Sequence, residues 1–540
     1  MSSKAVLIGL DGATFSILDP LMERGVMPAL RDLIARGVRA PLLSVIPPLT
    51  PPAWTSLMTG LRPGRHGVFD FFQKETPESR YFRFAEASDI QSETIWSLAS
   101  AHGRRVTALN FPLMFPAPAV NGCVVPGGWM PWKQLRLGCH PAGLFDRLKL
   151  LPSFHAKELA LDMMLEEKTL EGCSDEELPD WIELHCRRER RWFDILAYLM
   201  EQEPADLTAI LFDGVDKLQH LCWRFLDPAC QSPTPTPFEQ QVRELCEGYF
   251  RQLDGLIAGI VDRAGPEATI VLASDHGFGP TWDVFYANTW LEQEGFLAWA
   301  DTRPTEDAQG GPRVGIGQIT RHVFEMDWDK TIAYAATPSS QGIHIVRKTA
   351  ETPNGVAPEE YDRVREEIIS RLKQLRHPET GRPVVSEVYR REEAYAGPHQ
   401  AFGPDITFFL EDNGVISILR SKSPFRRRSA PAGTHHPEGA FIAFGAGVKS
   451  GAALPALSLV DVAPLLLYSL DVPIPADLDG RLPSEVFEPW ALSDRPPVFS
   501  ESVEEGPRVA PAVATTIDPA YDEADEGVIL QRLRALGYVE

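Results

Sequence analysis

An unbroken apolar run at residues 5–10, ending in Asp11 and Gly12, constrains the fold of this chain most strongly. A short apolar run without polar alternation is typical of a parallel strand that is covered on both faces. Further runs that we expect to be strands of the same sheet lie at residues 40–45, 105–110, 207–212, 269–273 and 441–444. Stretches long enough for helices separate these runs. The sequence therefore predicts an α/β fold with a mostly parallel central sheet flanked by helices.

Two helices can be placed from the spacing of their apolar residues. Residues 27–35 place apolar side chains on one face before Gly37, and residues 241–264 repeat apolar positions every three or four residues. The second helix directly precedes the run at 269–273, as expected for alternating helices and strands.

Two regions interrupt this alternation. Residues from about 111 to 200 are helical and charged, which predicts an inserted helical cap, and residues from about 285 to 425 form a mixed insertion. A polar stretch at 301–315, containing Pro and Gly, is expected to be a mobile loop. We expect one domain over residues 1–490. Residues 491–540 are expected to form a partly disordered acidic tail with a short amphipathic piece at 529–536.

The composition narrows the function classes. A formal charge of −23 disfavours nucleic-acid polymers and anionic membranes as partners, because both require a basic surface. The chain has no apolar stretch of about 20 residues, and the run at 5–10 is too short for a signal peptide. Seven widely spaced cysteines, an odd number, are expected to be thiols in the cytoplasm. An anionic substrate would then need local positive charge, which divalent cations supply.

The segment at residues 44–72 contains a candidate nucleophile. Thr50 is expected to be the N-cap of a helix whose first turn holds Pro51 and which Gly60 ends. The positive end of a helix dipole favours phosphate binding. Taken alone, this stretch favours the simpler interpretation that Thr50 only caps its helix.

Aspartate and histidine residues, most of them in pairs, lie at or near several predicted strand ends. Asp11 ends the first run, and the other pairs are Asp216 with His220, Asp275 with His276, and His435 with His436. Each pair alone has a structural explanation, as a turn or a solvated pair. The ends of neighbouring parallel strands meet at one sheet edge, so together they could form one cluster. Mixed oxygen and imidazole ligands suit zinc or manganese.

The motifs and their order resemble the type I phosphodiesterase/nucleotide pyrophosphatase family of the alkaline phosphatase superfamily. The matching segments are LIGLDG at residues 7–12, TPPAWTSLMTGLRPGRHG at 50–67, DGVDKLQHLCW at 213–223, SDHGFG at 274–279 and GTHHPEGAFIAFGAG at 433–447. The resemblance implies an alkaline phosphatase-like catalytic domain with Thr50 as the nucleophile. It also implies two divalent ions, with Zn²⁺ expected and Mn²⁺ as the alternative.

The resemblance assigns the metal ligands residue by residue. One ion would be held by Asp11, Thr50, Asp275 and His276, and the other by Asp216, His220 and His435. His436 is the alternative to His435, which we favour because it directly follows Gly-Thr.

The implied activity is hydrolysis of a small-molecule phosphate ester or nucleotide through a phosphothreonine intermediate, with a diester favoured. The alternatives are a phosphomonoesterase, a phosphotransferase or mutase on the same site, and a non-catalytic metal-binding protein. Phe71 stands where the family's eukaryotic members have an asparagine that holds a phosphoryl oxygen. Three arginines are weak candidates for the one that marks phosphomonoesterases: Arg62, Arg65 and Arg347. The natural substrate and the oligomeric state stay open.

The two insertions are expected to shape the pocket for the leaving group. Tyr334 and His344, in the segment 317–347, are the candidate side chains, and packing alone would explain both equally well.

Overall fold

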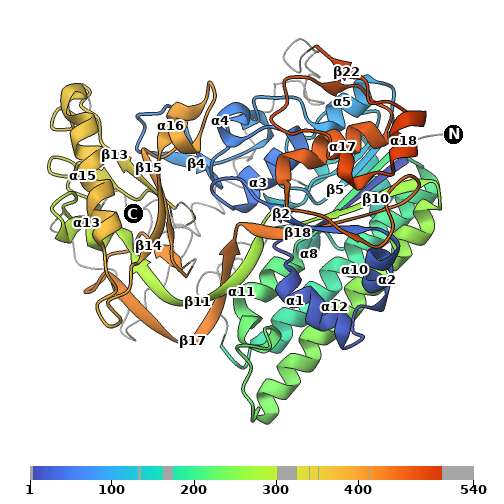
Figure 1. Ribbon diagram of the computed structural model, residues 1–540, viewed down its shortest axis with the longest axis horizontal. Helices are drawn as coiled ribbons and strands as arrows, with labels where there is room; N and C mark the ends of the chain where they lie inside the picture. The colour runs from blue at the N-terminus through green and yellow to red at the C-terminus, as the bar shows by residue number, and fades with distance from the viewer. Residues whose placement is uncertain are drawn as a thin grey trace.

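The computed structural model has two lobes joined by long strands (Figure 1). It describes residues 4–501 except 132–134, 162–173, 301–324, 338, 340, 351 and 413. The expected mobile loop at 301–315, the tail from residue 502 and its amphipathic piece at 529–536 lie outside the described residues, and the domain boundary at residue 490 stays a prediction. Among the described helices, none combines the length and the apolar character needed to cross a bilayer.

A nine-stranded sheet forms the centre of the larger lobe. Its order is β19 (Ala452–Ala453), β2 (Val38–Leu43), β18 (Glu438–Phe444), β10 (Ala268–Ala273), β1 (Lys4–Leu10), β9 (Leu207–Phe212), β5 (Val106–Leu109) and β6 (Gly122–Val125), with β20 (Leu457–Ser458) also paired to β2. Strand β18 is antiparallel to β10 and β2, and the other pairs are parallel. The predicted mostly parallel sheet is confirmed.

Helices cover both faces of this sheet because β1 is apolar on both. Val6 and Ile8 pack into one core, and Ala5 and Leu7 into the other. The first core is covered by α1 (Phe15–Glu23), α2 (Pro28–Arg36), α10 (Leu178–Gln202), α11 (Gly214–Leu226) and α12 (Pro237–Ala264). The second is covered by α3 (Thr50–Thr59), α5 (Ile95–Ala101) and α17 (Val462–Ser469). In Figure 1 these two sets lie on opposite sides of the sheet.

Both helices expected from apolar spacing are present, as α2 and α12. Helix α12 begins four residues earlier than predicted, because Thr236 and Glu239 form a capping box around Pro237. The predicted helical insertion contains α10, which packs along α12 and onto β9. The same region holds α6 (Leu135–Gly138), α7 (Leu144–Leu148), α8 (Ala156–Leu159), β7 (Gly128–Pro131) and β8 (Ala160–Leu161).

The smaller lobe is built mainly from the mixed insertion. Strands β11 (Gly277–Tyr286) and β17 (Phe425–His436) pair antiparallel and extend from the larger lobe into it (Figure 1). They share a three-stranded sheet with β16 (Val415–Ser417). Beside it lies a second sheet in the order β12 (Ala333–Tyr334), β13 (Gly342–Ile345), β15 (Ile406–Leu410) and β14 (Val385–Arg390). Helices α13 (Ala287–Gln293) and α15 (Tyr361–Gln374) complete its core.

Short elements complete the described chain. The helices are α4 (Pro63–His66), α16 (Arg391–Ala394) and α18 (Pro489–Asp494), with 3₁₀ turns η1 (Ala87–Asp89), η3 (Pro358–Glu360), η4 (Gln400–Phe402), η5 (Leu459–Asp461) and η6 (Ser484–Val486). The remaining strands form the pairs β3 (Phe72–Lys74) with β4 (Phe82–Phe84) and β21 (Ile474–Pro475) with β22 (Phe499–Ser500).

Candidate active site

Three adjacent strand ends meet at one edge of the central sheet. Strand β1 lies between β9 and β10 and is parallel to both, so their carboxyl ends are neighbours. Asp11 directly follows β1, Asp275 follows β10, and α11 begins just after β9. The Gly12 N–H donates to Asp275 Oδ1 at 3.1 Å. The first two loops are therefore joined at the edge where ligands bind in such sheets.

Thr50 is the first residue of α3, and Leu49 is the N-cap. The prediction that Thr50 is the N-cap is wrong by one residue, and its Oγ1 lies 3.4 Å from His276 Nε2. Pro51 and Pro52 follow, so this helix start also has fewer N–H donors than the dipole argument assumes. Gly60 ends the helix at φ +69°, as predicted.

The first predicted ligand set converges on one histidine nitrogen. His276 Nε2 lies 3.2 Å from Asp275 Oδ2, 3.6 Å from Asp11 Oδ1 and 3.4 Å from Thr50 Oγ1. All four residues are buried. The four side chains assigned to one ion by the resemblance thus face a common point.

The second predicted set converges in the same way. Asp216 Oδ1 lies 3.4 Å from His220 Nε2 and 3.2 Å from His435 Nε2, and the two histidine nitrogens are 3.1 Å apart. The rings of His276 and His435 stack with centroids 3.8 Å apart, so the two sets adjoin. A side chain at Gly433 would place Cβ 2.2 Å from the Gln219 carbonyl oxygen, so glycine allows β17 to approach α11.

The adjacent histidines His435 and His436 differ in their contacts. They are the last two residues of β17, a strand that was not among the predicted apolar runs. His435 reaches the cluster, and His436 Nδ1 accepts the N–H of Glu438 at 3.2 Å. Successive strand residues point to opposite faces, which accounts for the difference.

Backbone carbonyls fix the tautomers of two histidines. Nδ1–H of His435 donates to the Pro48 oxygen, and Nδ1–H of His276 donates to the Gly277 oxygen, both at 3.1 Å. Each Nε2 therefore carries a lone pair directed into the cluster, as in histidines that bind metals. Burial also lowers the pKa of His276 and of His435, which favours the neutral form that a metal needs.

Three buried carboxylate oxygens of the cluster face no hydrogen-bond donor among the described residues. Asp11 Oδ1, Asp216 Oδ1 and Asp275 Oδ2 are buried without a hydrogen-bond partner among the described atoms. Burial and the charge of neighbouring carboxylates raise the pKa of Asp11 and of Asp275. Because unpaired buried charge is costly, this donor set fits divalent cations. Two overlapping groups meet metal-site spacing, Asp11 with Asp275 and His276, and Asp216 with His276 and His435.

Two supporting side chains were not predicted. Trp54 Nε1 donates to Asp11 Oδ2 at 3.4 Å, and Gln219 Nε2 donates to the Gly12 oxygen at 2.7 Å. Trp54 lies one helical turn after Thr50 on α3. This spacing could have predicted that the two side chains lie on the same face of the helix. Gln219 gave no comparable signal, because its contact with Gly12 joins residues 207 positions apart.

A buried glutamate holds the start of α11, the helix that carries Asp216. Glu189 Oε1 accepts the Gly214 N–H at 2.7 Å and the Tyr249 hydroxyl at 2.9 Å. A Cβ at Gly214 would lie 2.5 Å from the same oxygen, so the approach requires glycine. Burial raises the pKa of Glu189 to about 8.

Replacing Glu189 with glutamine should change how stability depends on pH. Folded Glu189 keeps its proton up to about pH 8, whereas the unfolded side chain ionises above about pH 4.5. The wild type should therefore lose up to about 1.4 kcal/mol per pH unit across that interval, and the glutamine variant should not. Thermal unfolding at pH 5, 6, 7 and 8 measures this as a growing difference in Tm.

Glu201→Gln is the matched control, because Glu201 is exposed on the same helix, α10. Its Tm should follow the wild type at every pH. Parallel Tm curves for the wild type and Glu189→Gln would contradict a protonated Glu189.

The three candidate arginines bind carboxylates outside the cluster. Arg65 pairs with Asp477 at 3.4 Å and with Asp479 at 3.3 Å. The backbone N–H of Arg62, whose side chain is exposed, donates to Asp479, and Arg347 pairs with Asp405 at 3.4 Å. None of these contacts includes a residue of the cluster.

Comparison with protein families identifies the chain. The model described as "Type I phosphodiesterase / nucleotide pyrophosphatase" matches residues 5–438. The chain belongs to this family. Membership places it in the alkaline phosphatase superfamily, as its motifs indicated, and makes it a hydrolase of phosphoric ester bonds. No curated protein sequence matches it significantly.

Solved structures share the fold at low sequence identity. Murine ectonucleotide pyrophosphatase/phosphodiesterase 5, an inactive threonine-to-alanine variant with AMP, is 15% identical and superimposes with a TM-score of 0.50, covering 91% of this chain and 99% of its own. The human protein is 14% identical with the same TM-score and coverage. Phosphonoacetate hydrolase from Sinorhizobium meliloti is 18% identical with a TM-score of 0.46, covering 87% of this chain and 96% of its own.

Proposed function

We propose that this phosphoester hydrolase is a metal-dependent phosphodiesterase that acts through a phosphothreonine intermediate. The observation that carries the proposal is the position of Thr50 Oγ1, 3.4 Å from His276 Nε2 at the border of a buried carboxylate and imidazole cluster. A threonine that served only to begin a helix would have no reason to face such donors.

Two divalent ions fit the donor sets as assigned by the resemblance, with Zn²⁺ expected and Mn²⁺ as the alternative. Bound there, they would supply positive charge for the phosphoryl oxygens and lower the pKa of a hydroxyl or water. Their proposed ligands are Asp11, Thr50, Asp275 and His276 for one ion and Asp216, His220 and His435 for the other. Trp54 would hold Asp11 in place through its hydrogen bond.

Thr50 then provides the nucleophile. Its hydroxyl gives a proton to solvent, Oγ1 forms a bond to phosphorus, and the bond from phosphorus to the leaving oxygen breaks, after which that oxygen takes up a proton from solvent. Water subsequently attacks the phosphothreonine and releases the second product, which regenerates the Thr50 hydroxyl. A histidine base is not required, because the ions would take the Nε2 lone pairs of His276 and His435 and would themselves lower the pKa of the hydroxyl.

The relatives support a small-molecule substrate. The murine protein was solved with AMP as an inactive threonine-to-alanine variant, so a nucleotide occupies a protein of this fold. By analogy, the substrate of this chain is a nucleotide or another small phosphodiester. A cytoplasmic location, expected from the odd number of cysteines, belongs to the same proposal; the six cysteines among the described residues are free thiols.

Hydrolysis of three esters tests the proposal. Purified protein with Zn²⁺ or Mn²⁺ is assayed with bis-p-nitrophenyl phosphate, p-nitrophenyl phosphate and the p-nitrophenyl ester of thymidine monophosphate. We expect metal-dependent turnover, with kcat/KM for a diester at least about tenfold above that for the monoester.

Faster hydrolysis of the monoester would instead show a phosphomonoesterase. Phosphoryl transfer to an added alcohol in preference to water would show a transferase. No turnover of any ester, with two metals bound, would leave the proposal without support and favour a narrower transferase or a binding protein.

A further inference from the structure

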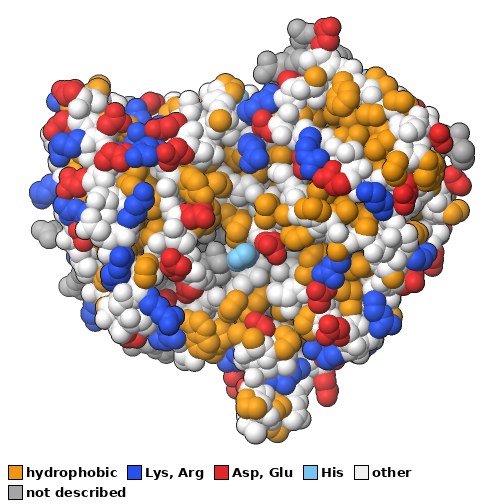
Figure 2. Space-filling model, viewed as in Figure 1, with side chains coloured by type: hydrophobic (Ala, Val, Ile, Leu, Met, Phe, Trp, Pro, Cys, Tyr) orange, Lys and Arg blue, Asp and Glu red, His pale blue; other side chains and the backbone are white. Residues whose placement is uncertain are grey.

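Two adjoining cavities lie beside the metal cluster, where the two lobes meet. Their volumes are about 20 Å³ and 70 Å³, and Lys74 and His344 line both. Figure 2 shows one face of the molecule, on which a histidine and acidic side chains are visible between the lobes. The inner cavity includes Pro47, and the next residue, Pro48, accepts the hydrogen bond from His435. The cavity wall and the metal cluster therefore share one short segment that leads to Thr50.

Lys74 is the charged group between these cavities. Its side chain is 8% exposed, and Nζ donates to His344 Nδ1 at 3.1 Å and lies 3.5 Å from the Pro77 oxygen. Burial lowers the pKa of His344 well below its usual value, so the ring is neutral and accepts the bond. Both hydrogen-bond partners of the ammonium are uncharged. Burial lowers the pKa of Lys74 to about 8, and the charges of Asp405 and Glu78 oppose this shift.

The outer cavity carries more positive than negative side chains. The cationic residues are Lys74, Arg80, Arg347 and Arg391, against two acidic residues, Glu78 and Asp405. Asp405 already accepts bonds from both Arg347 and Arg391, and from the Ile345 N–H at 2.7 Å. Such an excess is notable in a chain with a net charge of −23. Negative charge from a ligand would complement it.

Arg80 and Lys74, two of the cationic residues of the outer cavity, each lie over an aromatic ring. The Arg80 guanidinium stacks over the Trp328 ring at 4.8 Å, and Lys74 Nζ lies 5.4 Å from the centre of the Phe82 ring. Aromatic faces keep a cation in place without neutralising it. Both groups therefore keep positive charge for an incoming anion.

Tyr334 and His344, which the sequence singled out as pocket residues, are buried walls of these cavities. Their rings contact each other with centroids 5.7 Å apart.

We propose that the cavities form a second anion subsite, in which Lys74 and Arg80 bind a phosphate or carboxylate carried by the organic group of the substrate. This inference rests on the proposed phosphodiesterase activity, because the first phosphoryl group lies at the metal cluster. The substrate class is thus a phosphodiester with a second, distal anion.

A matched series of esters tests the subsite. The probes are 4-nitrophenyl alkyl phosphates of increasing chain length that end in methyl, carboxylate or phosphate. At the length that spans the two sites, an anionic end should raise kcat/KM about tenfold over the methyl end, the effect of one charge-assisted contact. Lys74→Met should abolish this ratio. Carboxylate and phosphate ends compared at that length show which anion the subsite prefers.

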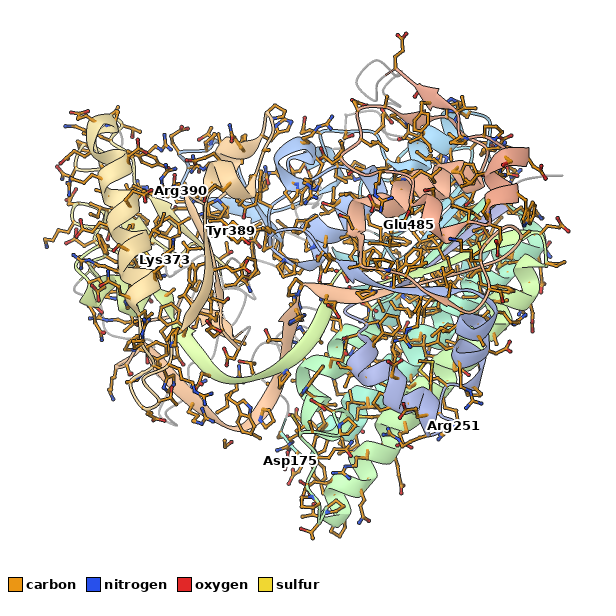
Figure 3. All side chains as sticks on the ribbon, in the orientation of Figure 1. Asp175, Arg251, Lys373, Tyr389, Arg390 and Glu485 are labelled. Atoms are coloured by element: carbon orange, nitrogen blue, oxygen red, sulfur yellow. The ribbon has the colours of Figure 1, made fainter. Side chains whose placement is uncertain are left out.

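Lys373→Met is the control, because Lys373 lies exposed on α15 in the smaller lobe (Figure 3). It should keep the full ratio. If Lys74→Met fails to fold, as judged by circular dichroism, Arg80→Gln on the half-buried wall gives the same readout. An equal kcat/KM for methyl and anionic ends at every length, or a ratio that survives both variants, would overturn the subsite.

Calorimetric titration separates the two proposals. If no ester is hydrolysed, the phosphodiesterase assignment fails, and binding of the same esters to the metal-loaded protein still decides the subsite. A Kd about tenfold lower for the anionic than for the methyl end, lost in Lys74→Met, supports it; equal values overturn it.

Discussion

Thr50→Ala is expected to lower kcat for the diester by about 10³-fold or more while the protein still binds two metal ions per chain. Removing a nucleophile eliminates the covalent route, which typically costs at least this factor. The metals should stay because Asp11, Asp275 and His276 remain as ligands of the first site. Steady-state kinetics with bis-p-nitrophenyl phosphate, together with metal analysis after gel filtration, measures both effects.

Thr55→Ala is the matched control on the same helix. Thr55 is fully buried in α3, and its hydroxyl has no hydrogen-bond partner among the described atoms, so this variant also removes one buried hydroxyl. It should keep kcat within a few-fold. Thr50→Ser, which retains a hydroxyl, should recover part of the activity. If Thr50→Ala kept a tenth or more of the wild-type kcat, Thr50 would not be the nucleophile.

The central sheet, and the meeting of its strand ends at one edge, could be predicted because each strand is marked by a short apolar run in the sequence. The run before Asp11 is apolar at every position, and such a run has few alternatives to a central strand. Once β1 and β10 are parallel neighbours, the residues that follow them meet at one edge. Asp11 and Asp275 could therefore be brought together without any knowledge of side-chain geometry.

What could not be predicted depends on contacts between distant residues. The contact of Lys74 with His344 spans 270 positions, and both residues are polar groups in segments without clear periodicity. The hydrogen bond that the Gly214 N–H donates to Glu189 spans only 25 positions, but it joins two different helices, α11 and α10, whose packing the sequence does not specify. Thr50 was misplaced by one residue because sequence alone does not separate an N-cap from the first helical position when proline follows.

His435→Ala is expected to remove most of the second metal and to lower kcat by about 100-fold or more. His435 and His220 each bring Nε2 within 3.4 Å of Asp216 Oδ1, so the loss of one imidazole leaves two ligands for the ion. The first site keeps His276 and its carboxylates. Metal content should fall from two towards one ion per chain after dialysis, and added Zn²⁺ should restore activity only at higher concentration than the wild type needs.

His436→Ala is the neighbouring control and decides between the two histidines. His436 also ends β17, but its Nδ1 bonds to the N–H of Glu438, and the alternation of side chains along a strand directs the two rings to opposite faces. This variant should bind two ions and retain most of its activity. If instead His436→Ala lost the ion and His435→Ala kept it, the end of β17 would have to rotate when metal binds, so that His436 and not His435 faces the cluster. The Nδ1–H bond from His435 to Pro48, which fixes that ring, opposes such a change.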